Sequence, residues 1–578
     1  MTRIAVIDKE KCKPTICGHE CKKCCPIEKK EADTCVTIGE HSVIDESTCI
    51  GCAICEKRCP FGAIKIINIP SISDDHIIHR YGKNGFAIYG LPSPKKESVL
   101  GLLGRNGIGK TTAVRILAGQ EKMNLGKDKA TDDEIKNFFQ GQELLTYLQE
   151  LEGKNIAYKP QNLSSLSKDI KVSELLSKRG SESQIKEFAE KLNITQVLGN
   201  RLNKLSGGEL QRVAIIAASL GESDIYFYDE PLAYLDISER LRVSDFIKDI
   251  AKDKIVVVVE HDLLILDYLT DYLSIFFGGQ GAFGVVSSPK TSKEGVNAYL
   301  SGFLRDENTR IRDKELKFNF TKNAPNAGAK ISSWDDFKIS FDSGFELDVK
   351  PGEIHQNHVI GILGRNGTGK TTFVRALAGE LEVEQNGKKQ KLDLDLDVSY
   401  KPQYLFTESE EIVRDIIFKE KINKKISSQF NLGVLQSKKI KDLSGGELQR
   451  LSIARCVSKD ADIYLIDEPS AYLDVEERIN VAKVIKDLMV EKEKTAFVID
   501  HDLLLVSYLA DSVINFTGVS GKSGIANSIV GFEDGISSLL QDLDITLRKE
   551  KDSGRPRINK KGSVKDREQK TRGHWVEL

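Results

Sequence analysis

Short apolar runs recur along the chain, and the two halves of the sequence carry them in the same order. Val99–Leu103 and Val359–Leu363 are continuous apolar runs, which is typical of buried parallel strands, and an amphipathic stretch follows each of them. Ile255–Val259 is a further run of this kind. None approaches the roughly 20 residues that cross a membrane. The pattern therefore predicts an α/β fold without a membrane span, built from two similar halves.

A glycine-rich loop follows each of the first two runs. Its sequence is GRNGIGKTT from Gly104 and GRNGTGKTT from Gly364. In such a loop, backbone N–H groups surround phosphates, the lysine reaches the outer phosphates, and the next hydroxyl takes Mg²⁺. The loop opens a helix, whose N-terminus favours anions. The predicted nucleotide-binding residues are Asn106, Gly107, Gly109, Lys110, Thr111 and Thr112 in the first half, and Asn366, Gly367, Gly369, Lys370, Thr371 and Thr372 in the second.

Residues suited to phosphate cleavage follow in the same order in both halves. An aspartate ends an apolar run in YFYDEP and YLIDEP, where it can reach Mg²⁺, and the next glutamate is placed to polarise the attacking water. Each YKPQ glutamine can contact metal and water, and a histidine after a later strand can meet the γ-phosphate. The predicted catalytic residues are Glu230, Gln161, His261, Glu468, Gln403 and His501. The predicted magnesium ligands are Thr111, Gln161, Asp229, Thr371, Gln403 and Asp467.

The string LSGGELQR occurs once in each half and indicates the class of ATPase. Its serine and glycine N–H groups open a helix and form a second anion site. The strings closely resemble those of ATP-binding-cassette (ABC) proteins, in which this site caps the nucleotide of the opposite cassette. The resemblance implies a monomer whose two cassettes pair with ATP between them, Asp236 and Asp474 lying in the inter-cassette loops. The implied capping residues are Ser206, Gly208 and Glu209, opposite Lys370, and Ser444, Gly446 and Glu447, opposite Lys110.

The first cassette carries an insert. Lys110 and Gln161 are 51 residues apart, whereas Lys370 and Gln403 are 33 apart. The extra residues, at about 125–155, begin with a capping box, TDDE from Thr131, followed by apolar residues at helical spacing on both sides of a glycine. We expect a helix–turn–helix that serves as a contact element. A lengthened surface element without a partner is the alternative.

Ten of the eleven cysteines precede residue 60. Four of them have the spacing of bacterial ferredoxins, and four upstream cysteines form a stretched version of it. In two-cluster ferredoxins the last cysteine of each run ligates the other cluster. We therefore expect two [4Fe–4S] clusters, with Cys24 and Cys35 as non-ligands, although Cys24 could replace Cys25. The predicted ligands are Cys12, Cys17, Cys21 and Cys59 for one cluster, and Cys49, Cys52, Cys55 and Cys25 for the other.

Two other uses of these cysteines remain open. Thiolate tetrads also suit zinc, although the close spacing before Pro60 favours a cubane. A disulfide scaffold is disfavoured because the N-terminus lacks an apolar signal region, which also predicts a cytoplasmic protein. No flavin motif accompanies the cysteines, so a structural or docking role is favoured over electron transfer.

Composition changes this picture little. The chain of 578 residues is 40% hydrophobic and 29% charged, as in ordinary globular proteins, and its net charge of −2 gives no global attraction to nucleic acid. A local exception is Arg548–Arg572, where eleven Lys and Arg residues face four acidic ones. This tail is suited to joining the cassettes or to contacting rRNA phosphates. A solvated basic tail is the alternative.

The chain as a whole resembles the ABC ribosome recycling factors, also called the RNase L inhibitor family or ABC subfamily E. The resemblance rests on the cysteine-rich head, HRY at His79–Tyr81, the insert, DENTRIR at Asp306–Arg312 and the tail from Arg555. The implied domains are a ferredoxin-like α+β iron–sulfur domain at 1–75, a first cassette at 76–300, a hinge at 301–325, a second cassette at 326–530 and a C-terminal hinge segment at 531–578.

The family resemblance also assigns further residues. Tyr81 and Phe86 resemble adenine-stacking aromatics, and Arg310 and Arg312, with the tail, resemble two hinge strips. The chain departs from the family at three positions. A tyrosine is usual near Trp334, a glutamate is usual at Asp500, and a serine is frequent at Leu232.

The resemblance implies a function. ATP binding closes the cassettes, moves the iron–sulfur head and splits the ribosome into large and small subunits after termination or rescue, and hydrolysis resets the clamp. The implied partners are the small subunit and the subunit interface with its rRNA, a release factor or Pelota-type rescue factor, and initiation factors. A cytosolic ATPase coupled to electron transfer through the head is the alternative.

Overall fold

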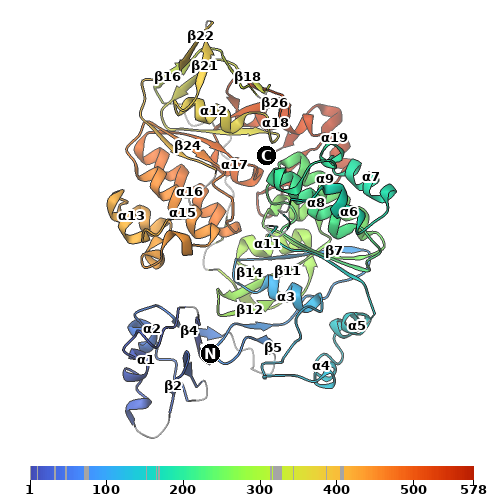
Figure 1. Ribbon diagram of the computed structural model, residues 1–578, viewed down its shortest axis with the longest axis vertical. Coiled ribbons are helices and arrows are strands. Elements are labelled where there is room, and N and C mark those ends of the chain that lie inside the picture. Colours follow the sequence, from blue (N-terminus) through green and yellow to red (C-terminus); the bar gives the residue numbers. More distant parts are fainter. Residues whose placement is uncertain are drawn as a thin grey trace.

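The computed structural model contains a small head, two cassettes and a C-terminal segment (Figure 1). It describes the chain except residues 1, 10, 31–33, 46–47, 70–76, 152, 164–165, 167–168, 313–314, 317–327, 343, 386, 404–408 and 578, and the side chains of residues 2–4, 30 and 67–69. The expected domain boundaries at 75–76 and 325–326, and the hinge residues 313–314 and 317–325, lie outside the described residues. Within the described part of the chain, no helix has the length and apolar character needed to cross a bilayer.

The head is a small α+β unit built around cysteines. Strands β1 and β4 pair antiparallel from Thr2 opposite Ile69 to Ile7 opposite Ile64, and two short helices lie beside them. Buried cysteines and isoleucines form its core. The elements are β1 (Thr2–Ile7), α1 (Glu20–Lys23), β2 (Val36–Ile38), β3 (Ser42–Ile44), α2 (Ile54–Arg58) and β4 (Ile64–Ile69).

The first cassette is a mainly parallel sheet of order β5-β6-β12-β11-β7-β10-β9-β8 with helices around it. The predicted strands Val99–Leu103 and Ile255–Val259 are confirmed as β7 and β10, which lie side by side in the middle of the sheet. The strands are β5 (Ile77–Arg80), β6 (Ala87–Tyr89), β7 (Ser98–Gly104), β8 (Ile156–Lys159), β9 (Ile225–Asp229), β10 (Ile255–Val259), β11 (Tyr272–Gly279), β12 (Phe283–Val286) and β13 (Lys290–Thr291). The helices are α3 (Lys110–Leu117), α4 (Asp132–Phe138), α5 (Glu143–Glu150), α6 (Val172–Ser177), α7 (Glu182–Lys191), α8 (Gly207–Ser219), α9 (Ile237–Ala251), α10 (Leu263–Leu269) and α11 (Ser292–Ser301).

The second cassette repeats this order as β17-β18-β27-β26-β20-β25-β24-β23, and β21 and β22 extend the sheet beyond β17. The predicted strand Val359–Leu363 is confirmed within β20. The strands are β16 (Lys330–Trp334), β17 (Phe337–Ser340), β18 (Glu346–Val349), β19 (Gly352–His355), β20 (His358–Gly364), β21 (Glu382–Gln385), β22 (Lys388–Lys391), β23 (Val398–Lys401), β24 (Ile463–Asp467), β25 (Thr495–Ile499), β26 (Ser512–Val519), β27 (Ser523–Ala526) and β28 (Val530–Gly531). The helices are α12 (Lys370–Leu377), α13 (Val413–Lys419), α14 (Lys424–Gln429), α15 (Gly445–Ser458), α16 (Val475–Lys492), α17 (Leu503–Leu509) and α18 (Phe532–Asp542).

The insert of the first cassette forms α4 and α5 beside β5 (Figure 1). The predicted capping box is present, because Thr131 accepts from the backbone N–H of Glu134 and Glu134 accepts from that of Thr131. Phe139, Leu144 and Tyr147 are buried, and the Tyr147 hydroxyl donates to the Leu117 carbonyl oxygen at 2.9 Å. The insert is therefore packed on the cassette core rather than loosely attached.

The C-terminal segment joins the two cassettes. It follows α18 of the second cassette, which packs on β26 as α11 packs on β11 in the first cassette. Beyond α18, β29 (Leu547–Lys549), β30 (Pro556–Ile558), β31 (Val576–Glu577) and α19 (Val564–Arg572) lie beside α10 and α9 of the first cassette (Figure 1). The contact includes an ion pair between Arg555 and Asp267, whose side chains are both only 1% exposed. The tail is thus tied to a cassette that it does not follow in sequence.

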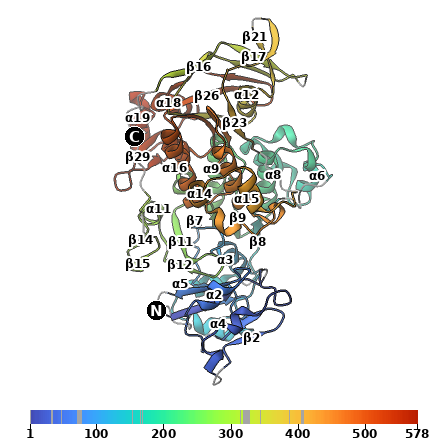
Figure 2. The same cartoon turned by 90° about the vertical axis from the view of Figure 1, so that its left-hand side faces the viewer.

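The head lies against the first cassette (Figure 2), and the turn between β5 and β6 contacts it. Asn84 is 1% exposed; its amide nitrogen donates to the Ala5 carbonyl, and its amide oxygen accepts from the Ile44 N–H at 2.9 Å. The Asn84 carbonyl also accepts from the Ile7 N–H. Val6 packs into an apolar cluster with β5, β6 and β12. One turn therefore joins head and cassette through three hydrogen bonds of a single residue, Asn84.

Candidate functional site: paired nucleotide sites and a cysteine-rich head

Each glycine-rich loop leaves the middle of its sheet and opens a helix. Lys110 and Lys370 are 6% exposed, and each ammonium donates to two loop carbonyls. Burial lowers the pKa of both lysines to about 8. Gly109 has a φ of +97°, and a Cβ there would lie 2.6 Å from the Phe86 ring, so only glycine fits. The loop is shaped to approach a ligand closely.

The predicted catalytic residues of the first cassette converge on one carboxylate. Gln161 donates to the Glu230 Oε1 at 2.8 Å, and His261 Nε2 lies 3.5 Å from the same oxygen. Thr111 Oγ1 is 3.4 Å from Asp229 Oδ2. Hydroxyl, carboxylate and amide oxygens are ligands that Mg²⁺ prefers. The arrangement can hold Mg²⁺ beside a carboxylate able to orient water.

The second cassette repeats this geometry. Gln403 donates to Glu468 Oε1 at 2.9 Å, and His501 Nε2 lies 3.6 Å from that oxygen. Thr371 Oγ1 is 2.9 Å from Asp467 Oδ2. Two independent occurrences of one arrangement in one chain argue that the side chains are placed for chemistry.

The ionisable groups here are strongly buried. Burial, with the Glu230 charge, raises the pKa of Asp229 to about 6. Burial and the Asp467 charge likewise raise the pKa of Glu468. Burial and the neighbouring Lys110 lower the pKa of His261, and burial and Lys370 lower that of His501 well below its usual value. Both histidines are therefore neutral at pH 7. In each ring one nitrogen can donate a hydrogen bond and the other can accept one.

Both glutamates have left-handed backbone conformations, with φ of +46° at Glu230 and +48° at Glu468. Such strain at a non-glycine residue is typical of functional sites and must be supported by neighbours. In the first cassette the Lys159 ammonium donates to the Asp229 and Glu230 carbonyls, and the Gln211 amide also donates to the latter. Lys401 and Gln449 repeat these bonds in the second cassette.

Sequence reasoning missed these four supporting residues. The signal was available, since the lysines lie within the repeated YKPQ strings and the glutamines within the repeated LSGGELQR strings. Their side chains are buried, with Lys159 and Lys401 each only 1% exposed. A buried lysine that binds only carbonyl oxygens serves to hold backbone in place.

The LSGGE strings open α8 and α15 with capping boxes at Ser206–Glu209 and Ser444–Glu447. A Cβ on Gly208 would lie 3.0 Å from the Tyr234 carbonyl oxygen, and that oxygen accepts from the Asn366 amide at 3.2 Å. The first LSGGE string is thus linked through Tyr234 to the second glycine-rich loop. A Cβ on Gly446 would lie equally close to the Tyr472 carbonyl oxygen.

The two cassettes face each other head to tail. Asp236 accepts from the Asn366 N–H at 2.7 Å, and Asp474 accepts from the Asn106 N–H at 3.1 Å. Each aspartate also caps the helix that follows it. The inter-cassette loop of each half therefore reaches the glycine-rich loop of the other, so that two nucleotide sites share one interface.

Aromatic side chains beside the loops mark where a base can stack. Tyr81 is 38% exposed, and its N–H donates to the Phe86 carbonyl at 3.0 Å. In the second cassette Phe341 makes the same bond to Phe345 and is also 38% exposed. Trp334, near which the family usually has a tyrosine, is 5% exposed in the core. Sequence reasoning missed Phe341 because it is not a tyrosine and its spacing to the next phenylalanine is one residue shorter.

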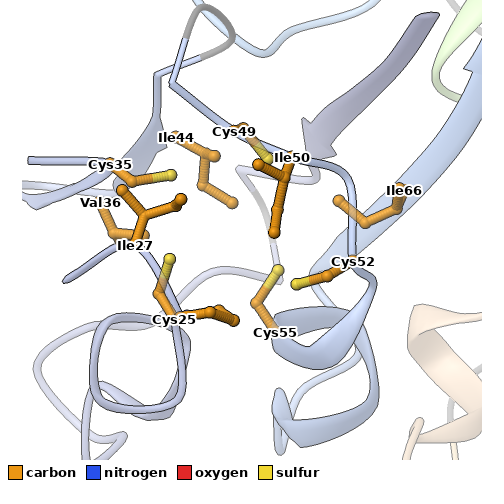
Figure 3. Close-up of a pocket in the computed structure, with 11 residues that line it drawn as sticks. Cys25, Ile27, Cys35, Val36, Ile44, Cys49, Ile50, Cys52, Cys55 and Ile66 are labelled. Carbon is orange, nitrogen blue, oxygen red and sulfur yellow. The ribbon is translucent and has the colours of Figure 1, made fainter. Parts of the chain in front are cut away.

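Five cysteines of the head line one apolar cavity (Figure 3). Four of them are the predicted ligands of the second cluster, Cys49, Cys52, Cys55 and Cys25, and the fifth is Cys35. Isoleucines and Val36 complete the wall. Burial raises the pKa of Cys55 to about 12, which metal coordination would reverse. Thiols around a dry apolar cavity fit the donor set of an iron–sulfur cluster.

The other predicted ligands gather at a second place. Ser42 links two of them, since its hydroxyl lies 3.6 Å from the Cys12 sulfur and 3.5 Å from the Cys21 sulfur. Cys17 and Cys59 lie close enough to Cys21 to raise its pKa, in addition to burial. The sulfur of Cys24 instead faces the Cys21 carbonyl oxygen at 3.7 Å.

Two departures from the family pattern, near the histidines predicted to be catalytic, are related. Asp500, before His501, accepts from the Ser470 hydroxyl at 2.8 Å and from the Ser470 N–H at 3.0 Å. In the first cassette Leu232 replaces this serine, so Glu260 has no hydroxyl donor at that position. Burial and the Glu230 charge raise the pKa of Glu260 to about 8. Glu260 is therefore mostly protonated at neutral pH, unlike the anchored Asp500.

Comparisons with known proteins match every part of this architecture. The "ABC transporter" family model matches residues 93–233 and 347–471, "4Fe-4S binding domain" matches 42–65, and "Possible Fer4-like domain in RNase L inhibitor, RLI" matches 2–30. The chain is therefore an ATPase with two cassettes that use ATP and Mg²⁺, preceded by a 4Fe–4S-binding domain. These matches confirm the predicted fold class, two tandem cassettes after an iron–sulfur domain, and the predicted cofactors ATP, Mg²⁺ and 4Fe–4S clusters.

Relatives match along nearly the whole chain. Translation initiation factor RLI1 of Saccharomyces cerevisiae is 40% identical, covering 100% of this chain and 98% of its own. A structure of ribosome-bound archaeal Pelota and ABCE1 matches with TM-score 0.93 and 43% identity, covering 100% and 99%. The archaeal ribosome recycling factor aABCE1, in complex with stalk protein aP1, matches with TM-score 0.82 and 41% identity, covering 88% and 100%. Because head, cassettes and tail all take part in these matches, the chain belongs to the RNase L inhibitor family of ABC proteins, ABC subfamily E.

Proposed function

We propose that this protein is a cytoplasmic ribosome recycling factor that uses ATP to split the ribosome into its large and small subunits. The observation that carries the proposal is the joining of two interlocked ATPase sites to a cysteine-rich head through the turn that holds Tyr81 and Asn84. Relatives of similar length include a ribosome-bound protein and a ribosome recycling factor.

Closure of the two cassettes is the mechanical step. ATP bound at Lys110 and Lys370 would be contacted from both sides, by one glycine-rich loop and by the opposite Ser206 or Ser444. Moving a clamp from 1:99 to 99:1 closed requires roughly 5.5 kcal/mol of differential affinity. Two multiply charged phosphate chains, each contacted by both cassettes, can supply a free energy of this size.

Hydrolysis then allows the clamp to reopen. Asp229 and Asp467, with the neighbouring threonines and glutamines, would hold Mg²⁺. Glu230 and Glu468 would orient and polarise the attacking water. His261 and His501, neutral because their pKa values are lowered, would hydrogen bond the γ-phosphate. Loss of that phosphate removes contacts that favour the closed state.

The head would act as a rigid arm. Cys49, Cys52, Cys55 and Cys25 would hold one [4Fe–4S] cluster, and Cys12, Cys17, Cys21 and Cys59 the other. When bound, the clusters supply cross-links that fix the fold of a unit with few strands. Asn84 lies within the turn that carries Tyr81, so a change at the first nucleotide site is positioned to move the head.

The insert and the tail are the proposed ribosome contacts. Helix α4 presents exposed Asp133, Lys136 and Asn137 to solvent, and the tail carries a net charge of +7 over Arg548–Arg572.

Deleting residues 128–152 would expose the core, because Tyr147 and Phe139 are buried. Charge reversal at Lys136 is the sharper test, with Lys186 on α7 as a control; equal binding of both variants to small subunits would contradict a contact by the insert.

Sucrose-gradient sedimentation of post-termination ribosomes tests the function. With a release or rescue factor, this protein and ATP, we expect 70S or 80S particles to be converted into separate subunits. A non-hydrolysable ATP analogue should support one round of splitting and leave the protein on the small subunit. Intact ribosomes under all conditions would contradict the proposal. Changing Cys52 to serine should then impair splitting, whereas electron transfer as the main function would leave splitting intact.

A further inference from the structure

Tyr81, beside the first glycine-rich loop, is held by a polar network behind its ring. Its hydroxyl donates to Glu121 Oε2 at 2.7 Å, and His79 Nε2 lies 3.2 Å from Glu121 Oε1. The His79 and Tyr81 rings pack edge to face, with centroids 4.7 Å apart and planes 76° apart. His79 is 7% exposed, so the network is anchored in the core while the tyrosine ring stays accessible.

The same hydroxyl connects the ring to the phosphate-binding loop. It lies 3.5 Å from Thr112 Oγ1, at the start of α3. Burial raises the pKa of Tyr81, so the hydroxyl stays protonated and remains a donor at neutral pH. A hydrogen bond from a hydroxyl to a carboxylate is stronger than one between neutral groups. The far end of the Tyr81 side chain is therefore held by a strong contact, and the plane of its ring is restrained by packing against His79.

The equivalent positions of the second cassette are entirely apolar. Phe341 matches Tyr81, because both donate to the carbonyl of the phenylalanine that faces the glycine-rich loop. Ile339 matches His79. In the first cassette the strand partner of His79 is Ile88, which lies against Gly109. In the second cassette the strand partner of Ile339 is Leu347, which lies against Gly369.

The third position follows from the chain after the first helix. The N–H of Gln120 donates to the Arg115 carbonyl and that of Glu380 to the Arg375 carbonyl, both at 2.9 Å. The next residues, Glu121 and Leu381, are therefore equivalent. Leu381 packs against the core of the second cassette and offers no acceptor for a hydroxyl.

We propose that Glu121 and His79 are positioning residues for Tyr81, giving the first site a preformed base platform and tighter nucleotide binding than the second site. The inference rests on the proposed function and on the assignment of Tyr81, by family resemblance, as an aromatic residue that stacks on the base. A ring already fixed in its bound orientation loses less conformational entropy on binding than a freely rotating one. Phe341 has no polar restraint of this kind.

The test measures nucleotide binding at one site in the full-length protein. Lys370→Ala weakens the second site, and ATP carrying a fluorescent label on its ribose is titrated into the first. We expect Tyr81→Phe and Glu121→Leu each to weaken binding about fivefold to tenfold, and the double variant to bind no worse than either. Glu121→Gln keeps an acceptor and should restore most of the affinity.

Controls separate positioning from folding and from stacking. Tripolyphosphate, which has no base, should bind all these variants equally, and their thermal unfolding midpoints should match. With Lys110→Ala, the triple change Ile339→His, Phe341→Tyr and Leu381→Glu should tighten the second site, whereas Phe341→Tyr alone should not.

Three results would overturn the inference, and they differ in meaning. If Tyr81→Ala weakens binding but Tyr81→Phe and Glu121→Leu do not, stacking holds and positioning by Glu121 fails. If Tyr81→Ala also leaves binding unchanged, the base does not stack on Tyr81, and the site assignment in the proposed function fails too. Strictly additive losses in the double variant would likewise refute a shared contact.

Discussion

The attachment of the tail to the first cassette includes one buried arginine, in addition to apolar packing and an ion pair between Lys293 and Glu550. Arg555 Nη2 donates to Asp267 Oδ2 at 2.7 Å, and both side chains are 1% exposed. Arg557, 19% exposed, lies 2.9 Å from the same oxygen. The two partners are 288 residues apart, and β30 packs on α10 at this point. Replacing Arg555 with methionine keeps much of the side-chain volume but leaves Asp267 buried with only one partner.

The expected cost follows from this geometry. Removing one partner of a buried ion pair costs roughly 3–5 kcal/mol, because the remaining charge is uncompensated. Arg557 stays in place, so we expect the lower end, about 3 kcal/mol. Each 1.4 kcal/mol corresponds to about a factor of ten, so the tail should open about 100-fold more often. The cost falls on local opening of residues 545–577, since the core of each cassette is unchanged.

Hydrogen exchange measured by mass spectrometry tests this estimate. Peptides from 545–577 should exchange about 100-fold faster in Arg555→Met, whereas peptides from β7 and β20 should not change. Lys565→Met is the matched control, because Lys565 and Glu568 form an exposed pair worth about 1 kcal/mol or less. The double variant Arg555→Met, Asp267→Leu should recover part of the protection. Unchanged exchange in Arg555→Met would refute the reasoning.

Three further outcomes follow from the sites. Changing both Glu230 and Glu468 to glutamine should trap ATP in a closed clamp, and undiminished phosphate release would contradict their role. The raised pKa of Glu260, about 8, means that the folded protein favours its neutral form. Stability from this group is therefore present below about pH 4.5 and is lost as pH rises through 8, at up to roughly 1.4 kcal/mol per unit. Glu260→Gln should flatten the dependence of the unfolding midpoint on pH between about pH 5 and 8; an unaltered slope would contradict this. Cys25→Ser should lower the iron content by up to half, whereas Cys24→Ser should not, and equal losses would refute the distinction.

The motifs predicted local structure well because their chemistry is local. A glycine-rich loop needs glycines, a lysine and a hydroxyl in sequence, so Lys110 and Lys370 could be placed on strand–loop–helix units from the pattern alone. The capping box at Thr131 was predicted for the same reason, since its two hydrogen bonds join residues three positions apart.

What the sequence could not predict depends on distant contacts. Asn84 is an unremarkable turn residue until its amide meets the backbone of Ala5 and Ile44. The consequence of a leucine at position 232 is visible only in the structure, where its counterpart, Ser470, donates a hydrogen bond to Asp500. Such pairings join residues far apart in sequence, and no local pattern encodes them.

The two halves of the interface are related by a repeat, yet one carboxylate makes them unequal. Glu476 lies two residues after Asp474, where the first cassette has Ser238. Glu476 pairs with Arg105 of the first glycine-rich loop at 2.7 Å and with Arg312 of the hinge at 3.2 Å.

Among the ion pairs of the described residues, none joins the second glycine-rich loop to a carboxylate of the first cassette. Arg365, the counterpart of Arg105, is exposed, and the residue at the position of Glu476 is uncharged Ser238. Separating the cassettes at the first site must therefore break ion pairs that also hold the hinge, whereas separation at the second site does not. Because hinge and loop share one carboxylate, Glu476 couples the first site to the hinge. The ion pairs of the described residues give the second site no such link.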